Sequence, residues 1–531
     1  MNTHRFQQRL ASLATLPLPL SPVLGLKGLE KESLRVTRDG RIARTPHPQA
    51  LGSALTHPHI TTDYSEALLE FITPPAELPE TGLGFLDEIH RFVYAVLPQD
   101  ELLLCTSMPI GFERDEDIPI ARYGDSNIGR MKHIYRVGLA YRYGRAMQAI
   151  AGIHFNYSLP TALWPALSPL LELGPASRAS QAAAYFALIR NVLRYGWLLL
   201  YLFGASPAVD RRFLTCRGGI PQGFEELTPD TFAPPFATSL RMSDIGYKNK
   251  TQAALFISTN TLDEYVRSLC HAIETPHPPY QAIGVKVGDR YRQLNANILQ
   301  IENEYYSPIR PKQIARPYEK PTLALKRRGV RYVELRALDL DPFEPLGIGV
   351  GQMRFLELFL WFCLLQDSPP LDREEHQCCQ HNLLLTAQRG RDPQLRLRDD
   401  GGEIPLRQWA ERILACLEPL SRLFDEQGGA GAYGQALADQ QRKVADAAHT
   451  PSARMIAEMT SRSEPFTAFA LRLSQAHADH FRQRPLPEER RRWFEQQAQR
   501  SWADQHRLEQ EDRLSFEEFL RRYFSETCQA A

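Results

Sequence analysis

Residues 28–35 read Gly28-Leu-Glu-Lys-Glu-Ser-Leu-Arg35, and this stretch places charged side chains inside a segment that otherwise has the character of a β-strand. Residues two apart share one face of a strand, so Glu30 and Glu32 are expected side by side. Two neighbouring carboxylates repel each other unless a cation lies between or beside them. The stretch therefore predicts a strand that presents carboxylates to a polar site inside the fold.

Three further segments carry charged or titratable groups in strand-like surroundings. Asp63 begins a segment in which Glu70 interrupts an apolar run, and His154 alternates with apolar neighbours. Glu334 and Arg336 are two apart, which puts both on one face of a third segment. A buried salt bridge or a strand-edge charge explains any one of these pairs. Four such segments in one chain instead favour a shared site, because each buried charge needs a partner.

The residue types in this set indicate which cation such a site prefers. Carboxylate oxygens with at most one imidazole select hard cations, Mg²⁺ or Mn²⁺, over zinc or copper. Several such cations beside an arginine form a site suited to polyphosphate. The sequence therefore predicts a metal-dependent site that binds a polyphosphate.

Composition and charge exclude several other classes of function. The chain has 531 residues, with 62 basic and 62 acidic side chains, and this balance argues against nucleic acid or an anionic membrane as partner. The apolar runs 197–203 and 355–365 are shorter than the ~20 residues of a membrane-spanning helix. Eight scattered cysteines favour reduced thiols and a cytoplasmic location.

The pattern of apolar residues predicts a mixture of strands and helices. Strands are expected at 33–36, 67–73, 153–159, 294–304 and 331–338, and helices at 87–97, 129–143 and 180–203. Residues 308–321 separate the last two strands. Beyond residue 367 the sequence becomes rich in Gln, Arg and Glu with helical character. We therefore expect a catalytic core over residues 1–366 and a mainly helical region over 367–531 packed on it.

Two motifs invite functions that the sequence does not support. His376-Gln-Cys-Cys-Gln-His381 suggests zinc, but adjacent cysteines do not match the usual ligand spacings. Gly347-Ile-Gly-Val-Gly351 lacks the strand-to-helix context of a dinucleotide-binding fingerprint. A loop that leads into a helix at 353–365 explains the glycines.

Several long motifs resemble those of the bacterial glutamate–cysteine ligases of the proteobacterial type. They are Gly28–Val36, Leu51-Gly-Ser-Ala-Leu-Thr-His57, Thr61–Thr73, Tyr123-Gly-Asp-Ser-Asn-Ile-Gly-Arg130, Tyr201–Pro207, Ala237-Thr-Ser-Leu-Arg-Met-Ser-Asp-Ile-Gly-Tyr247, Leu299-Gln-Ile-Glu-Asn-Glu304 and Ile309-Arg-Pro-Lys312. The likeness covers residues 24–365. After that point the resemblance is limited to length and helical character.

The resemblance implies an α+β fold related to glutamine synthetase, in which an antiparallel sheet forms a half-barrel or funnel with helices around it. It implies metal ions on the concave face of this sheet. Glu32, Asp63 and Glu70 would hold one Mg²⁺, while Glu30, His154 and Glu334 would hold the ion that bridges the nucleotide phosphates.

The same resemblance implies ATP-dependent ligation of the γ-carboxylate of glutamate to the amino group of cysteine, the first step of glutathione biosynthesis. A carboxylate has a poor leaving group, so ATP would activate it as γ-glutamyl phosphate. Arg336 is the candidate for the developing phosphate charge, and Arg241 for the α-carboxylate of glutamate. Arg310 and Lys312 either contact ATP phosphates or belong to a solvated basic loop.

The resemblance also implies a cysteine pocket, formed by Tyr64, Tyr135, Leu139, Gln148, Tyr247 and Tyr306. Core packing is an alternative role for Tyr306. A related ligase with another amine acceptor, or a non-catalytic nucleotide- or metal-binding regulator on the same fold, stays open as a second function. Glutathione shares the γ-glutamylcysteine portion of the product, so feedback inhibition at the same pocket is expected.

Overall fold

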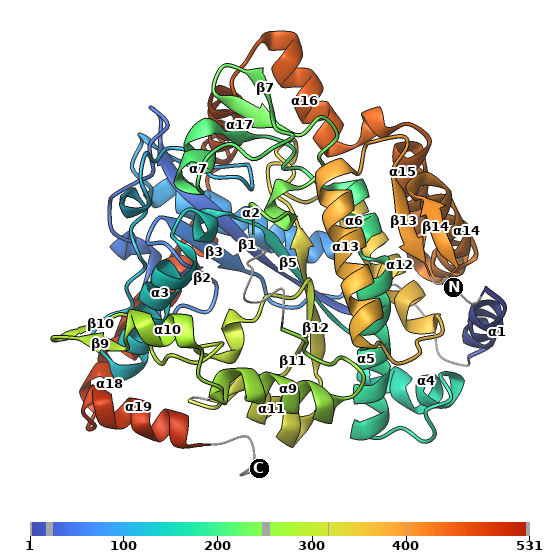
Figure 1. Cartoon of the computed structure of the whole chain (residues 1–531), viewed down its shortest axis with the longest axis horizontal. Helices are drawn as coiled ribbons and strands as arrows, with labels where there is room; N and C mark the ends of the chain where they lie inside the picture. The colour runs from blue at the N-terminus through green and yellow to red at the C-terminus, as the bar shows by residue number, and fades with distance from the viewer. Residues whose placement is uncertain (1–2, 17–24, 247–254, 317, 400, 527–531) are drawn as a thin grey trace.

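The computed structural model describes residues 3–16, 25–246, 255–316, 318–399 and 401–526 (Figure 1). The strands of the main sheet are β1 (Leu26–Thr37), β2 (Ile60–Thr62), β3 (Leu68–Ile72), β4 (Glu101–Leu103), β5 (Ile153–Ser158), β11 (Ile309–Lys312) and β12 (Tyr332–Leu338). Shorter strands are β6 (Val209–Asp210), β7 (Glu225–Thr228), β8 (Thr231–Ala233), β9 (Lys286–Val287), β10 (Arg290–Tyr291), β13 (Arg396–Asp399) and β14 (Gly402–Pro405).

Helices surround this sheet. Up to residue 366 they are α1 (Thr3–Ala14), α2 (Pro79–Val96), α3 (Asn127–Tyr143), α4 (Trp164–Leu170), α5 (Arg178–Tyr195), α6 (Trp197–Phe203), α7 (Arg211–Cys216), α9 (Leu262–Glu274), α10 (Pro278–Ile283), α11 (Pro321–Arg328) and α12 (Val350–Leu365). After it they are α13 (Arg373–Arg389), α14 (Leu406–Phe424), α15 (Ala432–Ala445), α16 (Pro451–Arg462), α17 (Phe466–Arg482), α18 (Glu488–Glu511) and α19 (Phe516–Ser525).

The main sheet is antiparallel and open. Its strand order is β11-β12-β5-β1-β3-β2, with β4 also paired to β1, and every pairing is antiparallel. The two ends of this order, β11 and β2, are edge strands, so the sheet does not close into a barrel. The α+β class with an antiparallel sheet is therefore confirmed. β1 lies near the centre and reaches β3, β4 and β5.

The two faces of the sheet differ in polarity because the register aligns like residues across strands. Directly opposite residues of antiparallel strands share a face, and Glu30 lies opposite His154 while Glu32 lies opposite Glu70. Glu334 lies opposite Asn156 on the next strand. One face is therefore polar over four strands. The other carries mainly apolar side chains such as Leu29, Phe71, Ile153, Phe155, Val333 and Leu335, each at most 1% exposed.

Helix α2 shows how the apolar face is covered. Pro79 occupies the first turn, where its missing N–H leaves no bond unmade. Leu83, Leu86 and Val93 are buried at helical spacing and point to the sheet side, where α2 contacts β1 and β3. Helices α5 and α12 pack against each other, and both lie to the right of the main sheet in Figure 1.

The helix predicted over residues 180–203 is two helices. α5 ends at Tyr195, α6 begins at Trp197, and the pair bends by 59° at Gly196. Among the described residues no single helix combines the length and the apolar character needed to cross a membrane, and this bent pair meets that test only when taken together.

Two expectations about the segment before β12 are wrong. Residues 294–304 form no strand in the structure, because side chains bind the backbone that a strand would pair. Gln300 accepts from the Leu294 N–H at 3.0 Å, and Glu304 accepts from the Gln300 N–H at 2.7 Å. The predicted separating stretch instead contains the edge strand β11, where Pro311 is tolerated because an edge leaves its missing N–H unused.

The helices after residue 367 contact the core at several places. α14 and α15 pack on α12, α17 packs on α2, and α19 contacts α3. Figure 1 shows α14 and α15 at one side of the molecule and α18 with α19 at the opposite edge. A short hairpin, β13 with β14, interrupts the helical sequence. The boundary at residue 366 stays a proposal.

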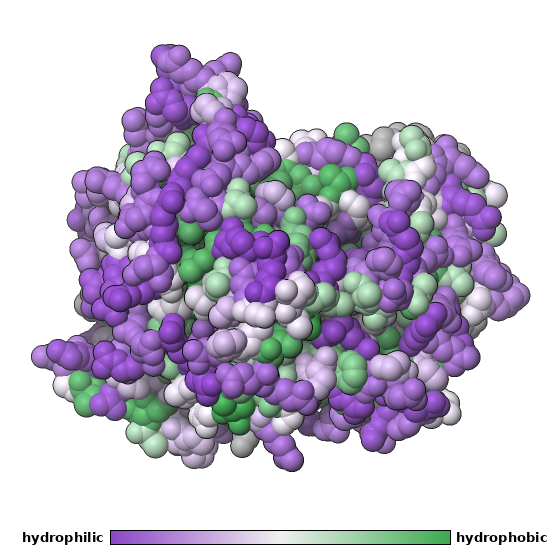
Figure 2. All heavy atoms as spheres, turned by 90° about the horizontal axis from the view of Figure 1, so that it is seen from above, coloured by the Kyte–Doolittle hydropathy of each residue, from purple (hydrophilic) through white to green (hydrophobic). Residues whose placement is uncertain are grey.

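Most of the face in Figure 2 is hydrophilic, with hydrophobic atoms in separate small areas. Among the residues that the structure describes, six cysteines are free thiols: Cys105, Cys216, Cys363, Cys378, Cys379 and Cys416.

Candidate active site

Three predicted metal ligands meet on the polar face of the sheet. One ligand atom from each of Glu30, His154 and Glu334 lies within 4.8 Å of the others. His154 Nδ1 lies 2.9 Å from Glu30 Oε2 and 3.7 Å from Glu334 Oε1. Asn156 donates to Glu30 Oε1 at 2.8 Å, while its own buried Oδ1 accepts no hydrogen bond from the described residues. In the part of the chain that the structure describes, this is the one cluster with such close ligand atoms.

Basic side chains flank the Glu334 carboxylate. Lys312 Nζ lies 3.0 Å from Oε1, and Arg336 donates to Oε2 at 3.0 Å. Burial by itself disfavours the charged carboxylate, but Lys312 and Arg336 outweigh burial and hold the pKa of Glu334 well below its usual range. Glu334 is therefore a carboxylate that keeps its charge inside the fold.

The second predicted trio brings three carboxyl groups together with too little positive charge nearby to keep all of them ionised. Glu32 is 3% exposed and accepts the Gly152 N–H at 2.8 Å. Burial, followed by the charge of Asp63, raises the pKa of Glu32 to about 8. Burial and then the charges of Glu30, Asp63 and Glu32 raise the pKa of Glu70 well above its usual range. A cation at this place would relieve the repulsion, which is what a metal-binding trio requires.

A cavity of about 110 Å³ adjoins these carboxylates. Its walls include five residues predicted for the cysteine pocket, namely Tyr64, Tyr135, Leu139, Gln148 and Tyr306, together with Glu32, Asp63, Arg310 and Arg336. The hydroxyl of Tyr64 is buried and has no hydrogen-bond partner among the described residues. Tyr306 lines the cavity, so core packing alone does not account for it.

The remaining predicted residues are placed as follows. Arg241 is 1% exposed, donates to the Arg336 carbonyl at 2.9 Å and lies 3.9 Å from Asp339. Its guanidinium packs against Gly152, where a Cβ would come within 2.2 Å of it. Arg310 is 8% exposed on β11, so the solvated-loop alternative is wrong for it. Tyr247 lies outside the described residues.

The sequence interpretation missed several residues of the cavity wall: Arg136, Tyr143, Met147, Asn303 and Glu304. Arg136 and Tyr143 lie on α3, the helix that also carries Tyr135 and Leu139. Positions 135, 139 and 143 are four apart and therefore lie on one face of the helix. This spacing was readable in the sequence and points to the face of α3 that lines the cavity.

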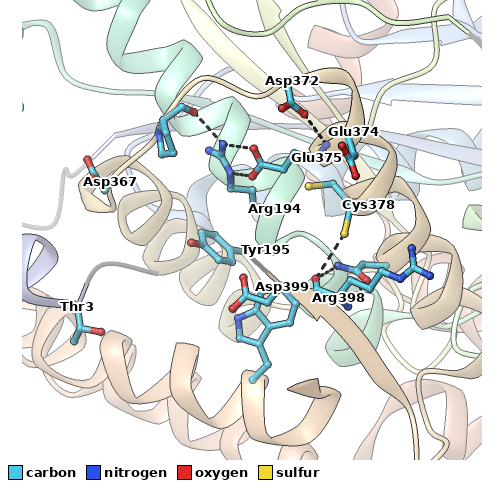
Figure 3. Close-up of a pocket in the computed structure, with 14 residues that line it drawn as sticks. Thr3, Arg194, Tyr195, Asp367, Asp372, Glu374, Glu375, Cys378, Arg398 and Asp399 are labelled. Atoms are coloured by element: carbon cyan, nitrogen blue, oxygen red, sulfur yellow. Dashed lines mark hydrogen bonds and ion pairs between the residues drawn. The ribbon is translucent and has the colours of Figure 1, made fainter. Parts of the chain in front are cut away.

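A larger cavity lies elsewhere in the described part of the chain. It measures about 740 Å³ and is lined by residues of α5, α13, β13 and α14, with none of the predicted site residues among them. Figure 3 shows Arg194 paired with Glu375 at its wall, and Cys378 facing the Arg398 carbonyl. The cysteines of the rejected zinc motif belong to this cavity. Cavity volume and the clustered charges therefore point to different places, because the charges lie at the smaller cavity.

Comparisons with known proteins agree with this geometry. The sequence model described as glutamate-cysteine ligase matches residues 23–385. A glutamate–cysteine ligase of Pseudomonas putida (strain W619) is 53% identical over 498 residues, covering 94% of each chain. One of Pseudomonas aeruginosa is 50% identical over 517 residues, covering 97% of each chain.

Solved structures give the same result. The crystal structure of the Francisella tularensis glutamate–cysteine ligase in complex with AMP superposes with a TM-score of 0.90 at 38% identity, covering 96% of this chain and 99% of that one. A bifunctional glutathione synthetase from Pasteurella multocida superposes with a TM-score of 0.69 at 27% identity, and the match covers 91% of this chain and 55% of that one.

An antiparallel sheet with carboxylates and basic groups around a small polar cavity defines the chain as an enzyme of the ATP-using ligase type, as the AMP-bound neighbour supports. The chain belongs to the glutamate–cysteine ligase family. The predicted function, formation of γ-glutamylcysteine from glutamate and cysteine, is confirmed by this membership, and the two alternative functions are not favoured.

Proposed function

We propose that the carboxylates on the polar face bind divalent cations, Mg²⁺ or Mn²⁺, and that the adjoining cavity holds glutamate and cysteine while ATP activates the γ-carboxylate. The observation that carries this proposal is the close approach of Glu30, His154 and Glu334 beside Arg336 and Lys312. Oxygen donors with one imidazole suit hard divalent cations.

The donor sets fit two positions for such cations. Glu30, His154 and Glu334 would hold one, with the buried Asn156 Oδ1 as a nearby polar atom that has no hydrogen-bond partner among the described residues. Glu32 and Glu70, opposite each other in the register, would hold the other together with Asp63. Bound divalent cations neutralise phosphate oxygens and orient the reacting groups.

Basic side chains of β11 and β12 would bind the nucleotide phosphates. Arg336 presents a planar fork that matches phosphate oxygens, and Arg310 and Lys312 lie on the neighbouring strand. These groups would stabilise the charge that develops as the γ-carboxylate of glutamate attacks the terminal phosphate. The product of this step is γ-glutamyl phosphate, and Arg241 would hold the α-carboxylate of glutamate.

The aromatic part of the cavity would hold cysteine. Tyr64, Tyr135, Leu139, Gln148 and Tyr306 enclose a space that suits a small side chain. The cysteine amine would attack the acyl phosphate and release phosphate. Such a pocket discriminates between similar side chains by about 1–3 kcal/mol per methylene, so 2-aminobutyrate should be a slower substrate.

Two further parts of the proposal concern feedback regulation and the location of the enzyme in the cell. Glutathione contains the γ-glutamylcysteine unit, so it should occupy the same cavity and compete with glutamate. Inhibition that is purely non-competitive with glutamate would count against this overlap. A cytoplasmic location follows from the use of ATP as co-substrate.

Phosphate release from ATP in the presence of glutamate tests the proposed function. We expect Mg²⁺-dependent release with cysteine, slower release with 2-aminobutyrate and little release without an amine. Turnover that proceeds equally well after chelation of divalent cations would refute the metal assignment. Faster turnover with another amine across a panel would change the assigned acceptor.

A further inference from the structure

Two motifs noted in the sequence contain no residue of the proposed site: Leu51–His57 and Tyr123–Arg130. Each has a glycine in the left-handed region, Gly52 with φ 87° and Gly124 with φ 75°. A Cβ at either glycine would overlap with side chains of helix α18. Both motifs therefore need glycine at the point where this C-terminal helix approaches the core.

A polar row on α18 binds both motifs. Ser501, Gln505 and Glu509 form this row, and because they are four residues apart they lie on one face of the helix. Ser501 Oγ accepts the Ser53 N–H at 2.9 Å, and Gln505 Oε1 accepts from the Ser53 hydroxyl at 2.5 Å. Glu509 Oε1 accepts the Asp125 N–H at 3.1 Å. The first motif is therefore held by one half of the row and the second by the other.

Gln505 joins the two halves of the polar row. Its Oε1 accepts from the first motif, while its Nε2 donates to Glu509 Oε1 at 2.9 Å. Gln505 is 7% exposed and Ser53 is fully buried. Buried polar groups that lose a partner cost free energy, so these hydrogen bonds fix the spacing of the two motifs.

From each motif one further hydrogen bond leads to the segment that carries Asp63. The carbonyl of Ala54, next to Ser53, accepts from Thr61 Oγ1 at 2.6 Å, and Thr61 lies on β2 two residues before Asp63. In the second motif, the Tyr123 hydroxyl donates to the Asp63 carbonyl at 2.8 Å. The backbone of Asp63 is therefore tied to both of the motifs that α18 holds.

Asp63 needs such support more than the other two carboxyl groups of its trio. Glu32 and Glu70 lie opposite each other on paired strands, which fixes their positions. Asp63 follows the end of β2, and its side chain is 43% exposed. We propose that α18, through Gln505, is a positioning element of the reaction centre that holds Asp63 where it shares a cation with Glu32 and Glu70. This inference rests on the proposed metal assignment of Asp63.

Mn²⁺ binding to the full-length, metal-free enzyme, followed by electron paramagnetic resonance, tests the inference. In Gln505→Ala we expect one ion to bind about 10-fold more weakly, as is usual when a group that orients a ligand is lost. This should be the ion that Asp63→Asn fails to bind, and the other ion should bind as before. The Mg²⁺ concentration for half-maximal phosphate release should rise by the same factor.

Matched variants separate positioning from general stability. Gln440 on α15 is also buried and donates within its own helix to the Ala436 carbonyl at 3.1 Å, so Gln440→Ala should keep Mn²⁺ affinity. Glu509→Gln keeps an oxygen acceptor and should bind Mn²⁺ like the unsubstituted enzyme, whereas Glu509→Ala should weaken the same ion. Thermal unfolding shows which variants fold. If Gln505→Ala does not fold, the two variants of Glu509 decide.

The outcomes separate this inference from the proposed function. Unchanged Mn²⁺ affinity in folded Gln505→Ala and Glu509→Ala overturns the inference. So does an equal weakening of both ions, or the same weakening in Gln440→Ala, because either result would show a general loss of structure. If Asp63→Asn binds as many ions as the unsubstituted enzyme, Asp63 holds no metal, and the proposed metal assignment itself is refuted.

Discussion

Strand β1 carries buried charged side chains on both of its faces, and the two faces differ in how completely these charges are paired. On the side of the helices, Lys27 and Glu357 form an ion pair at 2.9 Å with both side chains fully buried. Tyr157 and Tyr433 donate to the two oxygens of Glu357 at 2.9 and 2.8 Å, and Lys27 also donates to the Glu77 carbonyl at 2.9 Å. The ammonium nitrogen of Lys27 and both carboxylate oxygens of Glu357 therefore have hydrogen-bond or ion-pair partners.

The polar face of β1 leaves its charges incompletely matched. Glu30 shares His154 with Glu334, and the pKa of Glu70 is raised well above its usual range by burial and by neighbouring carboxylates. A buried charge that serves stability is satisfied by the protein itself. A buried charge that serves binding lacks a full set of counter-charges and hydrogen-bond partners in the protein, and a bound ligand supplies them. If the proposed site is right, the two faces of β1 separate structural charge from functional charge in one strand.

The largest expected effect comes from removing a carboxylate of the polar face. Glu334→Gln should lower kcat by on the order of 100- to 1000-fold, because the cluster loses the charge that holds a cation and fixes Arg336. Steady-state phosphate release measures this effect. Unchanged turnover, with folding confirmed by circular dichroism, would show that the polar face is structural as well.

The matching change on the apolar face should affect stability instead. Glu357→Gln leaves Lys27 buried without its counter-charge, and we expect the free energy of unfolding to fall by about 3–5 kcal/mol. Urea denaturation measures this loss. The kcat per folded molecule should stay within about twofold, since no contact to the cavity is changed. A large loss of kcat without loss of stability would remove the distinction between the faces.

Lys31, on the apolar face between Glu30 and Glu32 in sequence, makes stability depend on pH. It donates to Ser33 at 3.0 Å and to His90 at 2.8 Å, and burial lowers its pKa to about 7. Because the lysine is protonated in the unfolded chain but neutral in the folded one above pH 7, the free energy of unfolding should rise with pH.

Relative to Lys31→Met, the expected slope is about 0.7 kcal/mol per pH unit at pH 7 and approaches about 1.4 kcal/mol per pH unit by pH 8.5. Urea denaturation of both proteins across this range gives the difference directly. Parallel curves for Lys31→Met and the unsubstituted protein would mean that the lysine is charged in the folded state.

The smallest expected effect comes from the Tyr433 hydroxyl, which donates to the buried Glu357 carboxylate of the Lys27–Glu357 ion pair. Tyr433→Phe removes the donor to Glu357 Oε2 and should lower the free energy of unfolding by about 1–3 kcal/mol. Because Tyr433 lies on α15, this change also tests how strongly the helices after residue 367 are tied to the sheet. A shift in the urea midpoint of α15 alone, seen by hydrogen exchange, would indicate local rather than global coupling.

Sequence patterns predicted the elements whose signal is local. Alternation of polar and apolar residues placed strands over 67–73 and 153–159, close to β3 and β5. The same alternation identified Glu30, Glu32, His154 and Glu334, because a charge inside an apolar run is conspicuous without any structure.

What the sequence did not predict depends on contacts between distant segments. Residues 294–304 have strand-like composition, yet the side chains of Gln300 and Glu304 bind the backbone there. The position of Arg136 on the cavity wall depends on the approach of α3 to the loop after β2, which no local pattern encodes. Asn156 was not among the predicted residues, although it lies two residues after His154 and therefore shares its face of the strand.

Binding of Mn²⁺, followed by electron paramagnetic resonance, tests the contrast between the faces most directly. The unsubstituted enzyme and Glu357→Gln should bind Mn²⁺ with the same stoichiometry and affinity, while Glu334→Gln should lose a bound ion or bind it on the order of 10- to 100-fold more weakly. Equal binding by the unsubstituted enzyme and Glu334→Gln would contradict the assignment of the polar face as the metal-dependent reaction centre.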